Sequence, residues 1–411
     1  MGIGDRFAHQ GKAQLSAFVK AKEQGVNVVP VWNKSHREHT IVGTDPHQVR
    51  QEADAATQDL DWQGTYFVDA DHIKHHNVDL FLDSCDFFTI DIAELIGVQA
   101  SGDDIDTFVN RFSPYIGILP LPGIESPISI SKADIKQFAE QYLAAIKEAG
   151  RIYRTITSKI GERRFITEVS LDECDQPQTP SEMFLILAAI ANEKIPAQTI
   201  APRFTGAFYK GIDYVGNLEK FSQEFEENMM IIRYATNEFS LPQNLKLSIH
   251  SGSDKFSIYG IMRNLMYKYD MGIHLKTAGT TWLEELIGLA LSEGEGLTIA
   301  KDIYAISLDR LDELCAPYAT VVKIDRASLP EKDVVRDWTG KLFADALRHN
   351  ADCRDYNSDF RQLLHVGYKI AAEMGEGYLS ALQKNETVIA VQVEENIYQR
   401  HIKKLFFPAQ T

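Results

Sequence analysis

The stretch FITEVSLDECDQPQTPSEMFLILAAIANEKIPAQTIA, residues 165–201, carries the repeating unit that decides the fold. A mostly apolar run predicts a strand over Phe165–Ser170. A helix is predicted over Pro180–Asn192, because it has proline in its first turn and a carboxylate, Glu182, near the positive end of its dipole. A second strand is predicted over Gln198–Ala201. The succession of strand, helix and strand is typical of a parallel sheet.

Similar apolar runs recur along the chain. They predict further strands at Val28–Trp32, Tyr66–Ala70, Phe87–Ile92, Lys246–His250, Ile273–Lys276, Tyr304–Leu308 and Val321–Ile324. Helices are predicted between them at Lys132–Ala149, Asn217–Thr236 and Trp282–Ser292. Most runs are continuously apolar, as parallel strands buried on both faces require. The pattern indicates an α/β protein, either a barrel or a doubly wound sheet.

The length of 411 residues is compatible with a (β/α)8 TIM-type barrel, and the barrel is expected to occupy about residues 26–330. From about Glu331 the pattern is mostly helical, most clearly at Tyr368–Leu382 and Val391–Leu405. This part, about 331–411, is interpreted as a C-terminal helical extension. Because no repeat, low-complexity segment or Pro/Ser-rich linker divides the chain, residues 1–411 are expected to form a single domain.

The amino-acid composition argues against nucleic acid and membranes as partners. The chain has 42 Lys and Arg against 58 Asp and Glu, a formal net charge of −16, which repels nucleic acid and anionic lipid. No apolar run approaches the roughly 18 residues of a membrane span, and the four cysteines form no CxxC pair. A cytoplasmic protein with a small-molecule ligand is expected, and assembly into a homo-oligomer is left open.

Polar residues gather where the predicted strands end. In YFVDADHI, residues 66–73, an apolar run leads into Asp71 and His72. His250 closes the strand in KLSIHSGSDKF, and His274 lies on the strand in GIHLKTAGTTW. Because the carboxyl ends of parallel strands meet at one edge of a barrel or sheet, these side chains are expected to share a site.

Three histidines on three strands favour a metal site, because imidazole is a common ligand and open catalytic sites often use three protein ligands. The predicted cofactor is one divalent cation (Zn, Mn, Ni or Co), bound by His72, His250 and His274. The alternative is that each histidine is an ordinary core residue. His36, His39, His75, His76 and His365 are left outside the site.

Other polar residues could bind substrate or handle protons. Glu168 lies within an apolar strand and needs a partner, so a salt bridge to Arg163 or Arg203 is the structural alternative to a role in the site. The small-residue loop after His250 contains Ser251, Ser253 and Lys255. Such a loop can hold a phosphate, a carboxylate or a sugar hydroxyl. A second loop rich in hydroxyls runs over residues 277–281.

Several segments resemble class II fructose-bisphosphate aldolases: VDADHI…FFTIDIAELI, TPSEMFLILAAI, SIHSGSDK and HLKTAGTTW. The resemblance implies that Asp71 is the acid/base and that His72 and His250 bind the metal. The chain departs from that family in two places. APRFTGAFYKG has Gly206 or its neighbours where the aldolases place a ligand histidine, and His274 appears where they have none.

A closer resemblance, nearly from end to end, is to the tagaturonate epimerase family. It is carried by GDRFAHQGKAQL, NKSHREHTIVGT, YFVDADHI, IHSGSDKFSIYG, HLKTAGTTWLEE and HVGYKIAAEMG. The resemblance implies a metal-dependent epimerase that interconverts D-tagaturonate and D-fructuronate, keto-uronates of hexuronate catabolism. On this reading Asp71 and Glu168 share proton transfer, or Glu168 is a fourth ligand. Lys255, Lys276 and Arg203 are then candidates for the substrate carboxylate, and Arg37 and Lys34 are weaker ones.

The two keto-uronates differ at the carbon β to the ketone, whose C–H is not acidic. Retro-aldol cleavage of the α–β bond, rotation of the aldehyde and re-addition would invert that centre. The alternatives are a class II sugar or sugar-phosphate aldolase that releases its fragments, and a non-catalytic aldolase-like barrel subunit.

Overall fold

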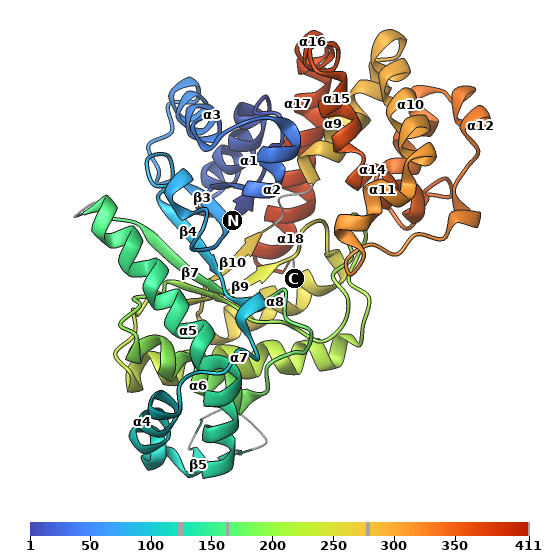
Figure 1. Cartoon of the computed structure of the whole chain (residues 1–411). Coiled ribbons are helices and arrows are strands. Elements are labelled where there is room, and N and C mark those ends of the chain that lie inside the picture. Colours follow the sequence, from blue (N-terminus) through green and yellow to red (C-terminus); the bar gives the residue numbers. More distant parts are fainter. Residues whose placement is uncertain (120, 122–126, 162–163, 277–279, 410–411) are drawn as a thin grey trace.

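The computed structural model describes residues 1–119, 121, 127–161, 164–276 and 280–409. Within these residues, eight parallel strands close a barrel in the order β1-β10-β9-β8-β7-β4-β3-β2 (Figure 1), so the predicted TIM-type α/β fold is confirmed. The strands are β1 (Gly2–Ile3), β2 (Val31–Ser35), β3 (Phe67–Ile73), β4 (Phe87–Asp91), β7 (Ile166–Ser170), β8 (Thr199–Ala201), β9 (Lys246–His250) and β10 (Ile273–Lys276). An antiparallel pair, β5 (Gly117–Leu119) and β6 (Ile128–Ile130), lies apart from the barrel.

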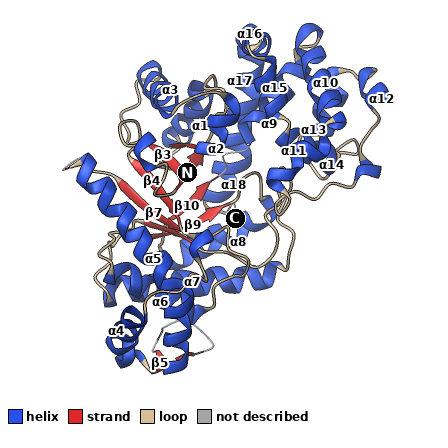
Figure 2. Ribbon diagram, viewed as in Figure 1, coloured by secondary structure: helices blue, strands red, loops and turns tan. Residues whose placement is uncertain are grey.

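The strand register brings the polar ends of the strands to one rim. Ser35 on β2 pairs with Asp71 on β3, and Lys276 on β10 pairs with His250 on β9. Nearly every strand residue is buried, since side chains fill the interior and helices cover the outside (Figure 2). This burial on both faces is the reason the strands have continuous apolar runs.

Two predicted strands are wrong. Tyr304–Leu308 lies within helix α10 (Gly294–Asp309), whose buried residues, among them Ala300, Ile303 and Ser307, recur at helical spacing. Val321–Ile324 forms no strand. Short apolar runs do not distinguish a strand from a buried helical segment, which explains the first error.

One barrel strand was not predicted: β1, at Gly2–Ile3, lies before the predicted start of the barrel at about residue 26. Its two residues pair with β10 on one side and β2 on the other. A strand of two residues produces no periodic pattern, so only the closure of the barrel reveals it.

Helices after the strands cover the barrel. They are α1 (Gly11–Glu23), α2 (His36–Val42), α3 (Pro46–Asp59), α4 (Gly102–Phe112), α5 (Lys132–Ile160), α6 (Pro180–Asn192), α7 (Leu218–Glu238) and α8 (Phe256–Tyr269). Helix α6 has the predicted bounds: the Thr179 side chain accepts from the backbone N–H of Glu182, and the Glu182 carboxylate accepts from the backbone N–H of Thr179. This reciprocal cap satisfies two amides and fixes where the helix begins.

The C-terminal part is helical from Thr280 onward and gathers on one side of the barrel (Figure 1). Its remaining helices are α9 (Thr280–Leu291), α11 (Leu311–Cys315), α12 (Lys332–Arg336), α13 (Gly340–Leu347), α14 (Ser358–Val366), α15 (Tyr368–Met374), α16 (Glu376–Lys384), α17 (Glu386–Glu395), a π-helix (Asn396–Ile402) and α18 (Lys403–Phe406). Helix α9 is buried along almost its whole length and packs against α10, α13 and α17. Among the described residues, no helix combines the length and the apolar character that crossing a membrane requires.

A buried aspartate ties this helical part to the barrel. Asp254, four residues after the end of β9, is fully buried and lies 2.8 Å from Arg361 Nη2, 3.2 Å from His349 Nδ1 and 3.0 Å from His401 Nε2. Arg361 lies in α14, His401 in the π-helix, and His349 in the loop after α13. The segment after β9 is therefore held in place from the C-terminal side.

Candidate active site

Two histidines and one carboxylate converge at the rim. His72 is the next-to-last residue of β3, His250 ends β9, and Asp172 follows β7. One ligand atom from each lies within 4.8 Å of the others. His250 Nδ1 is 3.0 Å from Asp172 Oδ2, and the two imidazole rings are 5.2 Å apart, edge to face. We call His72, Asp172 and His250 the metal-donor group.

A distortion of β3 aims His72 at this group. The pairing of β3 with β4 shifts register between Ala70 and Ile73, and His72 has a positive φ of 53°. Such an irregularity breaks the strand's alternation and re-aims a side chain. As a result His72 Nε2 lies 3.7 Å from Asp71 Oδ1, although neighbouring residues of a regular strand would point to opposite faces.

Two more carboxylates border His72. Asp91 ends β4 and has Oδ2 3.7 Å from His72 Nδ1, and Glu173 forms a second possible donor group with His72 and Asp91. No role was predicted from the sequence for Asp91, Asp172 or Glu173. Asp91 is the last residue of β4, and Asp172 and Glu173 follow β7; these positions at strand ends are the signal that could have identified them.

The electrostatics fit a cation at the metal-donor group. Burial disfavours charged imidazole, yet the Asp172 carboxylate outweighs it and raises the pKa of His250 to about 9. The pKa of His72 is raised well above its usual range, because Asp71 and Asp172 overcome the effect of burial.

The ring nitrogens that would bind a cation face carboxylates. Nδ1 of His250 lies 3.0 Å from Asp172 Oδ2, and Nδ1 of His72 lies 3.7 Å from Asp91 Oδ2. Both nitrogens are buried. A divalent cation and a proton would compete for such nitrogens. Imidazole and carboxylate donors suit zinc-like divalent metals, so these residues fit the predicted cofactor.

Lys276, on β10, lies at the centre of three carboxylates inside the barrel. Its Nζ is 2.7 Å from Asp69 Oδ2, 2.8 Å from Asp71 Oδ1 and 3.1 Å from Glu168 Oε1. Lys276 was predicted as a candidate for the substrate carboxylate. Its ammonium is instead surrounded by carboxylates of the protein.

One lysine cannot neutralise three carboxylates. Burial would raise the pKa of Asp71, but Lys276 outweighs it and lowers this pKa to about 2. The pKa of Glu168 is likewise held well below its usual range against burial, by Lys276 and His250. For Asp69 burial prevails, and its pKa is raised to about 7. Asp69 is therefore the first of the three carboxylates to take up a proton as the pH falls.

Glu168 contacts the metal-donor group through His250. Its Oε1 lies 2.7 Å from His250 Nε2, and its Oε2 accepts from the Thr199 hydroxyl at 2.6 Å. Its ion-pair partners are Lys276 and His250 rather than Arg203, whose guanidinium donates to the backbone carbonyl of Asp172. Arg163, the other predicted partner, lies outside the described residues.

His274 is not brought to the other two predicted ligands. It lies two residues before Lys276 on β10, deeper in the barrel, and its ring stacks on Phe87 with centroids 5.1 Å apart. Burial lowers its pKa well below the usual range, so the ring is neutral. His274 lies deeper because it is two residues before the end of β10, whereas His250 is the last residue of β9.

The loop after β9 is fastened internally. Lys255 Nζ donates to the backbone carbonyls of Tyr209 and Ile212, at 3.0 and 2.7 Å. The Ser251 hydroxyl donates to the carbonyl of Lys276, and the Ser253 hydroxyl accepts from a backbone amide. These side chains hold loops together and are not free for a ligand. Of the second predicted loop, residues 277–279 lie outside the described residues, and 280–281 begin α9.

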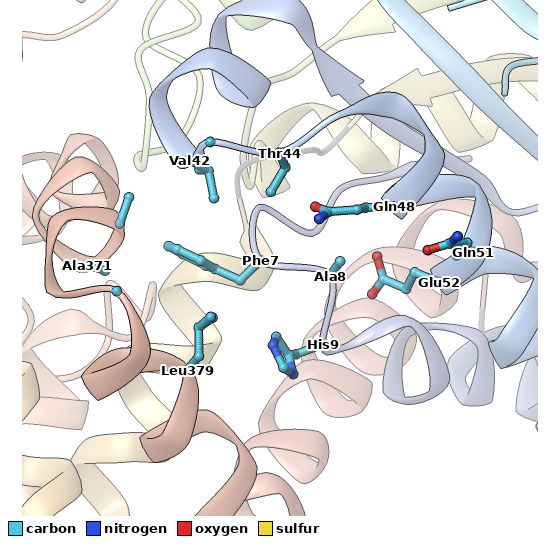
Figure 3. A pocket seen from close by; sticks show the side chains of 13 residues that line it. Phe7, Ala8, His9, Val42, Thr44, Gln48, Gln51, Glu52, Ala371 and Leu379 are labelled. Carbon is cyan, nitrogen blue, oxygen red and sulfur yellow. The ribbon is translucent and has the colours of Figure 1, made fainter. Parts of the chain in front are cut away.

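A cavity of about 540 Å³ lies elsewhere, between the N-terminal loop, α2–α3 and α15–α16 (Figure 3). Phe7, Val42 and Leu379 supply apolar walls, and Gln48 and Glu52 supply polar ones. None of the residues of the metal-donor group lines it. The cavity therefore adds nothing to the candidate site.

Comparison with known proteins adds the family. A family model described as tagaturonate epimerase (UxaE) matches residues 1–406. Tagaturonate/fructuronate epimerase of Thermotoga maritima is 26% identical over 423 aligned positions, 98% of this chain and 80% of that protein. The native crystal structure of fructuronate-tagaturonate epimerase UxaE from Cohnella laeviribosi has a TM-score of 0.80 at 24% identity, covering 98% of this chain and 80% of the other. A probable tagatose 6 phosphate kinase from Sinorhizobium meliloti has a TM-score of 0.50 at 9% identity, covering 98% and 99%.

Proposed function

The chain belongs to the tagaturonate epimerase family, which makes it an epimerase of the isomerase class, and we propose that it interconverts D-tagaturonate and D-fructuronate with a divalent cation bound by His72, Asp172 and His250. This ligand set keeps two of the three histidines predicted from the sequence. Asp172 replaces His274, because His274 stacks on Phe87 deeper in the barrel.

The single observation that carries the proposal is the position of Asp71. Its carboxylate lies 3.7 Å from His72 Nε2 and 2.8 Å from Lys276 Nζ, so an ionised carboxylate borders the metal-donor group. A bound divalent cation would supply Lewis acidity toward the ketone oxygen and a neighbouring hydroxyl. Asp71, kept ionised by Lys276, is placed to handle a proton on the same substrate.

The reaction must invert the carbon β to the ketone without removing its hydrogen. In our proposal Asp71 takes the proton of the β-hydroxyl, whose O–H electrons become the carbonyl of an aldehyde. The electron pair of the α–β bond passes to the other fragment, which becomes an enediolate. The aldehyde then rotates and presents its opposite face to the enediolate. The α–β bond re-forms, and Asp71 returns the proton to the new hydroxyl.

Glu168 and Lys276 act as positioning residues in this proposal. Glu168 holds the imidazole of His250 by the nitrogen that faces away from Asp172. A carboxylate behind a metal-binding histidine fixes its orientation and raises its basicity. Lys276 holds the Asp71 carboxylate in position through an ion pair and keeps it charged at neutral pH. Glu168, which is fully buried, is therefore assigned to support rather than to the fourth ligand position.

The experiment that tests the function is incubation with D-tagaturonate and Zn, Mn, Ni or Co in turn, followed by separation of the six-carbon epimers and any three-carbon products. We expect D-fructuronate to form with at least one metal. Deuterium on the β carbon should remain there after epimerisation, because that C–H bond is never broken. Loss of the label would reject the cleavage mechanism. Three-carbon fragments as the main product would identify an aldolase instead.

A further inference from the structure

Three basic side chains lie at the rim beside the metal-donor group without a role in the proposed chemistry. Arg6 follows β1, Arg37 lies in the first turn of α2, and Lys210 lies in the long loop after β8. We call Arg6, Arg37 and Lys210 the cationic cluster. Its members come from three separate strand–helix connections.

Two tyrosines from the C-terminal part bring the cluster together. The guanidinium of Arg37 and the ammonium of Lys210 lie 5.0 and 5.4 Å from the ring centroid of Tyr318. The Arg6 guanidinium lies 4.3 Å from the ring of Tyr368, and the two tyrosine hydroxyls are 2.7 Å apart. Aromatic faces hold the cations by cation–π attraction without neutralising them.

Within the described residues, the three cations of the cluster have one close ion pair, that of Arg6 with Glu38. Arg6 Nε lies 3.3 Å from Glu38 Oε1, but Arg6 Nε and Nη1 are buried and have no hydrogen-bond partner among the residues that the structure describes. Within the described part of the chain, the side chains of Arg37 and Lys210 make no ion pair within 4.0 Å. Burial lowers the pKa of Lys210, as expected for an ammonium that lacks a close counter-charge.

His365, which the sequence analysis left outside the site, adds a second unsatisfied group. Its side chain is only 1% exposed, and neither ring nitrogen has a hydrogen-bond partner among the described residues. Burial and the charges of Arg6 and Lys210 hold its pKa well below the usual range, so the ring is neutral. Buried polar groups without partners are costly, and their concentration here indicates a ligand.

The cluster lies within reach of the same ligand as the metal-donor group. Lys210 Nζ is 3.9 Å from where a Cβ on Gly252 would lie, and Gly252 is two residues beyond His250. Glu38, the ion-pair partner of Arg6, forms a reciprocal cap with Ser35 at the start of α2. Ser35 in turn pairs in register with Asp71. The negative charge of Glu173 acts on His72 on one side and on Arg37 and Lys210 on the other.

We propose that Arg6, Arg37 and Lys210 bind the carboxylate of the keto-uronate substrate while its ketone end faces His72, Asp172 and His250. This inference rests on the proposed function. It keeps Arg37, a weaker candidate from the sequence, and replaces the main candidates Lys255, Lys276 and Arg203, which are engaged within the protein. Arg and Lys donors form strong, charge-assisted hydrogen bonds with a carboxylate.

The position of the carboxylate suits retro-aldol chemistry. The carboxylate stays on the aldehyde fragment, two bonds from the carbon that is inverted. A charged anchor at that end keeps the fragment bound while its carbonyl turns. The metal-donor group holds the other fragment, so the α–β bond can re-form before either part escapes.

The test compares Lys210→Met and Lys210→Arg with wild type, using kcat and KM for D-tagaturonate and direct calorimetric binding of D-glycerate, a three-carbon hydroxy acid. Lys268→Met is the matched control, because Lys268 is an exposed lysine of α8 paired with Glu226. We expect Lys210→Met to raise KM and weaken glycerate binding about 10- to 100-fold, the effect of losing a hydrogen bond to a charged group. Bound metal should be unchanged, Lys210→Arg should recover most of the loss, and Lys268→Met should match wild type.

Glycerate binding that is equal in Lys210→Met and wild type, or absent from wild type, would overturn the inference. So would a Lys210→Arg variant as weak as Lys210→Met, since charge would then not be the cause. Inorganic phosphate that binds more tightly than glycerate would identify a phosphate site instead. If wild type binds glycerate through Lys210 but does not epimerise D-tagaturonate, the proposed function fails and the carboxylate site stands.

Discussion

His250 Nε2 lies 2.7 Å from Glu168 Oε1, while His250 Nδ1 lies 3.0 Å from Asp172 Oδ2. The ring is therefore held between a fully buried carboxylate on one side and a half-buried one at the rim on the other. Such an arrangement fixes which nitrogen is available to a metal. In our proposal Glu168 acts through His250 and does not bind the metal itself, so its loss should have a smaller effect than the loss of a ligand.

Replacing Glu168 by alanine should weaken metal binding about 10- to 100-fold, as removal of a carboxylate behind a metal-binding histidine typically does. Competition with a chromogenic chelator measures the change. Glu168→Gln, which keeps an oxygen that can accept from His250, serves as the control and should lose less. Unchanged affinity in Glu168→Ala would show that His250 needs no support.

Removal of bound metal with a chelator should abolish epimerisation, and adding back the divalent cation that was removed should restore it. His250→Ala should lose tightly bound metal, as measured by elemental analysis, together with turnover. His274→Ala should keep it, because His274 stacks on Phe87 away from the metal-donor group. Loss of metal in His274→Ala, with the fold intact, would return that residue to the ligand set.

Asp71→Asn should retain metal and lose turnover by about 100- to 10,000-fold, the usual contribution of a positioned acid/base group. An amide keeps the shape of the side chain but cannot take the proton of the β-hydroxyl. Steady-state kinetics and metal content together check this prediction. Near-normal turnover would reject the proton-transfer role, and loss of metal would make Asp71 a ligand.

Stability should depend on pH through Asp69. Burial raises the pKa of Asp69 to about 7, whereas a free aspartate titrates near about 4. Between about pH 4 and 7 the unfolded chain releases this proton and the folded protein keeps it. The contribution of Asp69 to the free energy of unfolding therefore falls as pH rises through this window and levels off above about pH 7.

Asp69→Asn is uncharged at every pH and isolates this contribution. Urea unfolding at intervals from pH 4 to 8 gives the free energy of unfolding of both proteins. Stability of the variant relative to wild type should increase up to about pH 7 and then stay constant. A difference that does not vary with pH would mean that Asp69 is ionised in the folded protein.

Asp254→Asn should reduce the free energy of unfolding by about 3–5 kcal/mol, because it leaves the fully buried Arg361 without its counter-charge. Asp333→Asn is the matched control: Asp333 pairs with Arg336 on the surface, where such pairs contribute at most about 1 kcal/mol. Urea unfolding compares the two. Equal, small effects would contradict the view that Asp254 fastens the helical part to the barrel.

Local patterns were sufficient for much of the fold. Strands Lys246–His250 and Ile273–Lys276 and helix Pro180–Asn192 have the bounds predicted for them, because apolar runs and the Thr179–Glu182 cap are local signals. His72 and His250 could be chosen because each lies at the end of a predicted strand. The same reasoning gave a wrong strand at Tyr304–Leu308, because a short apolar run within α10 is also compatible with a strand.

The sequence by itself determined the α/β class, the strand ends that carry His72, Asp71 and His250, and the family resemblance, because these depend on residues close together in the chain. Only the tertiary structure decided that β1 closes the barrel, that Asp172 rather than His274 lies beside the two histidines, and that Lys276 faces three carboxylates. These relationships depend on barrel closure, strand register and the irregularity at His72. The cationic cluster is the clearest case, since Arg6, Arg37 and Lys210 meet only because the C-terminal helices pack Tyr318 and Tyr368 against the rim.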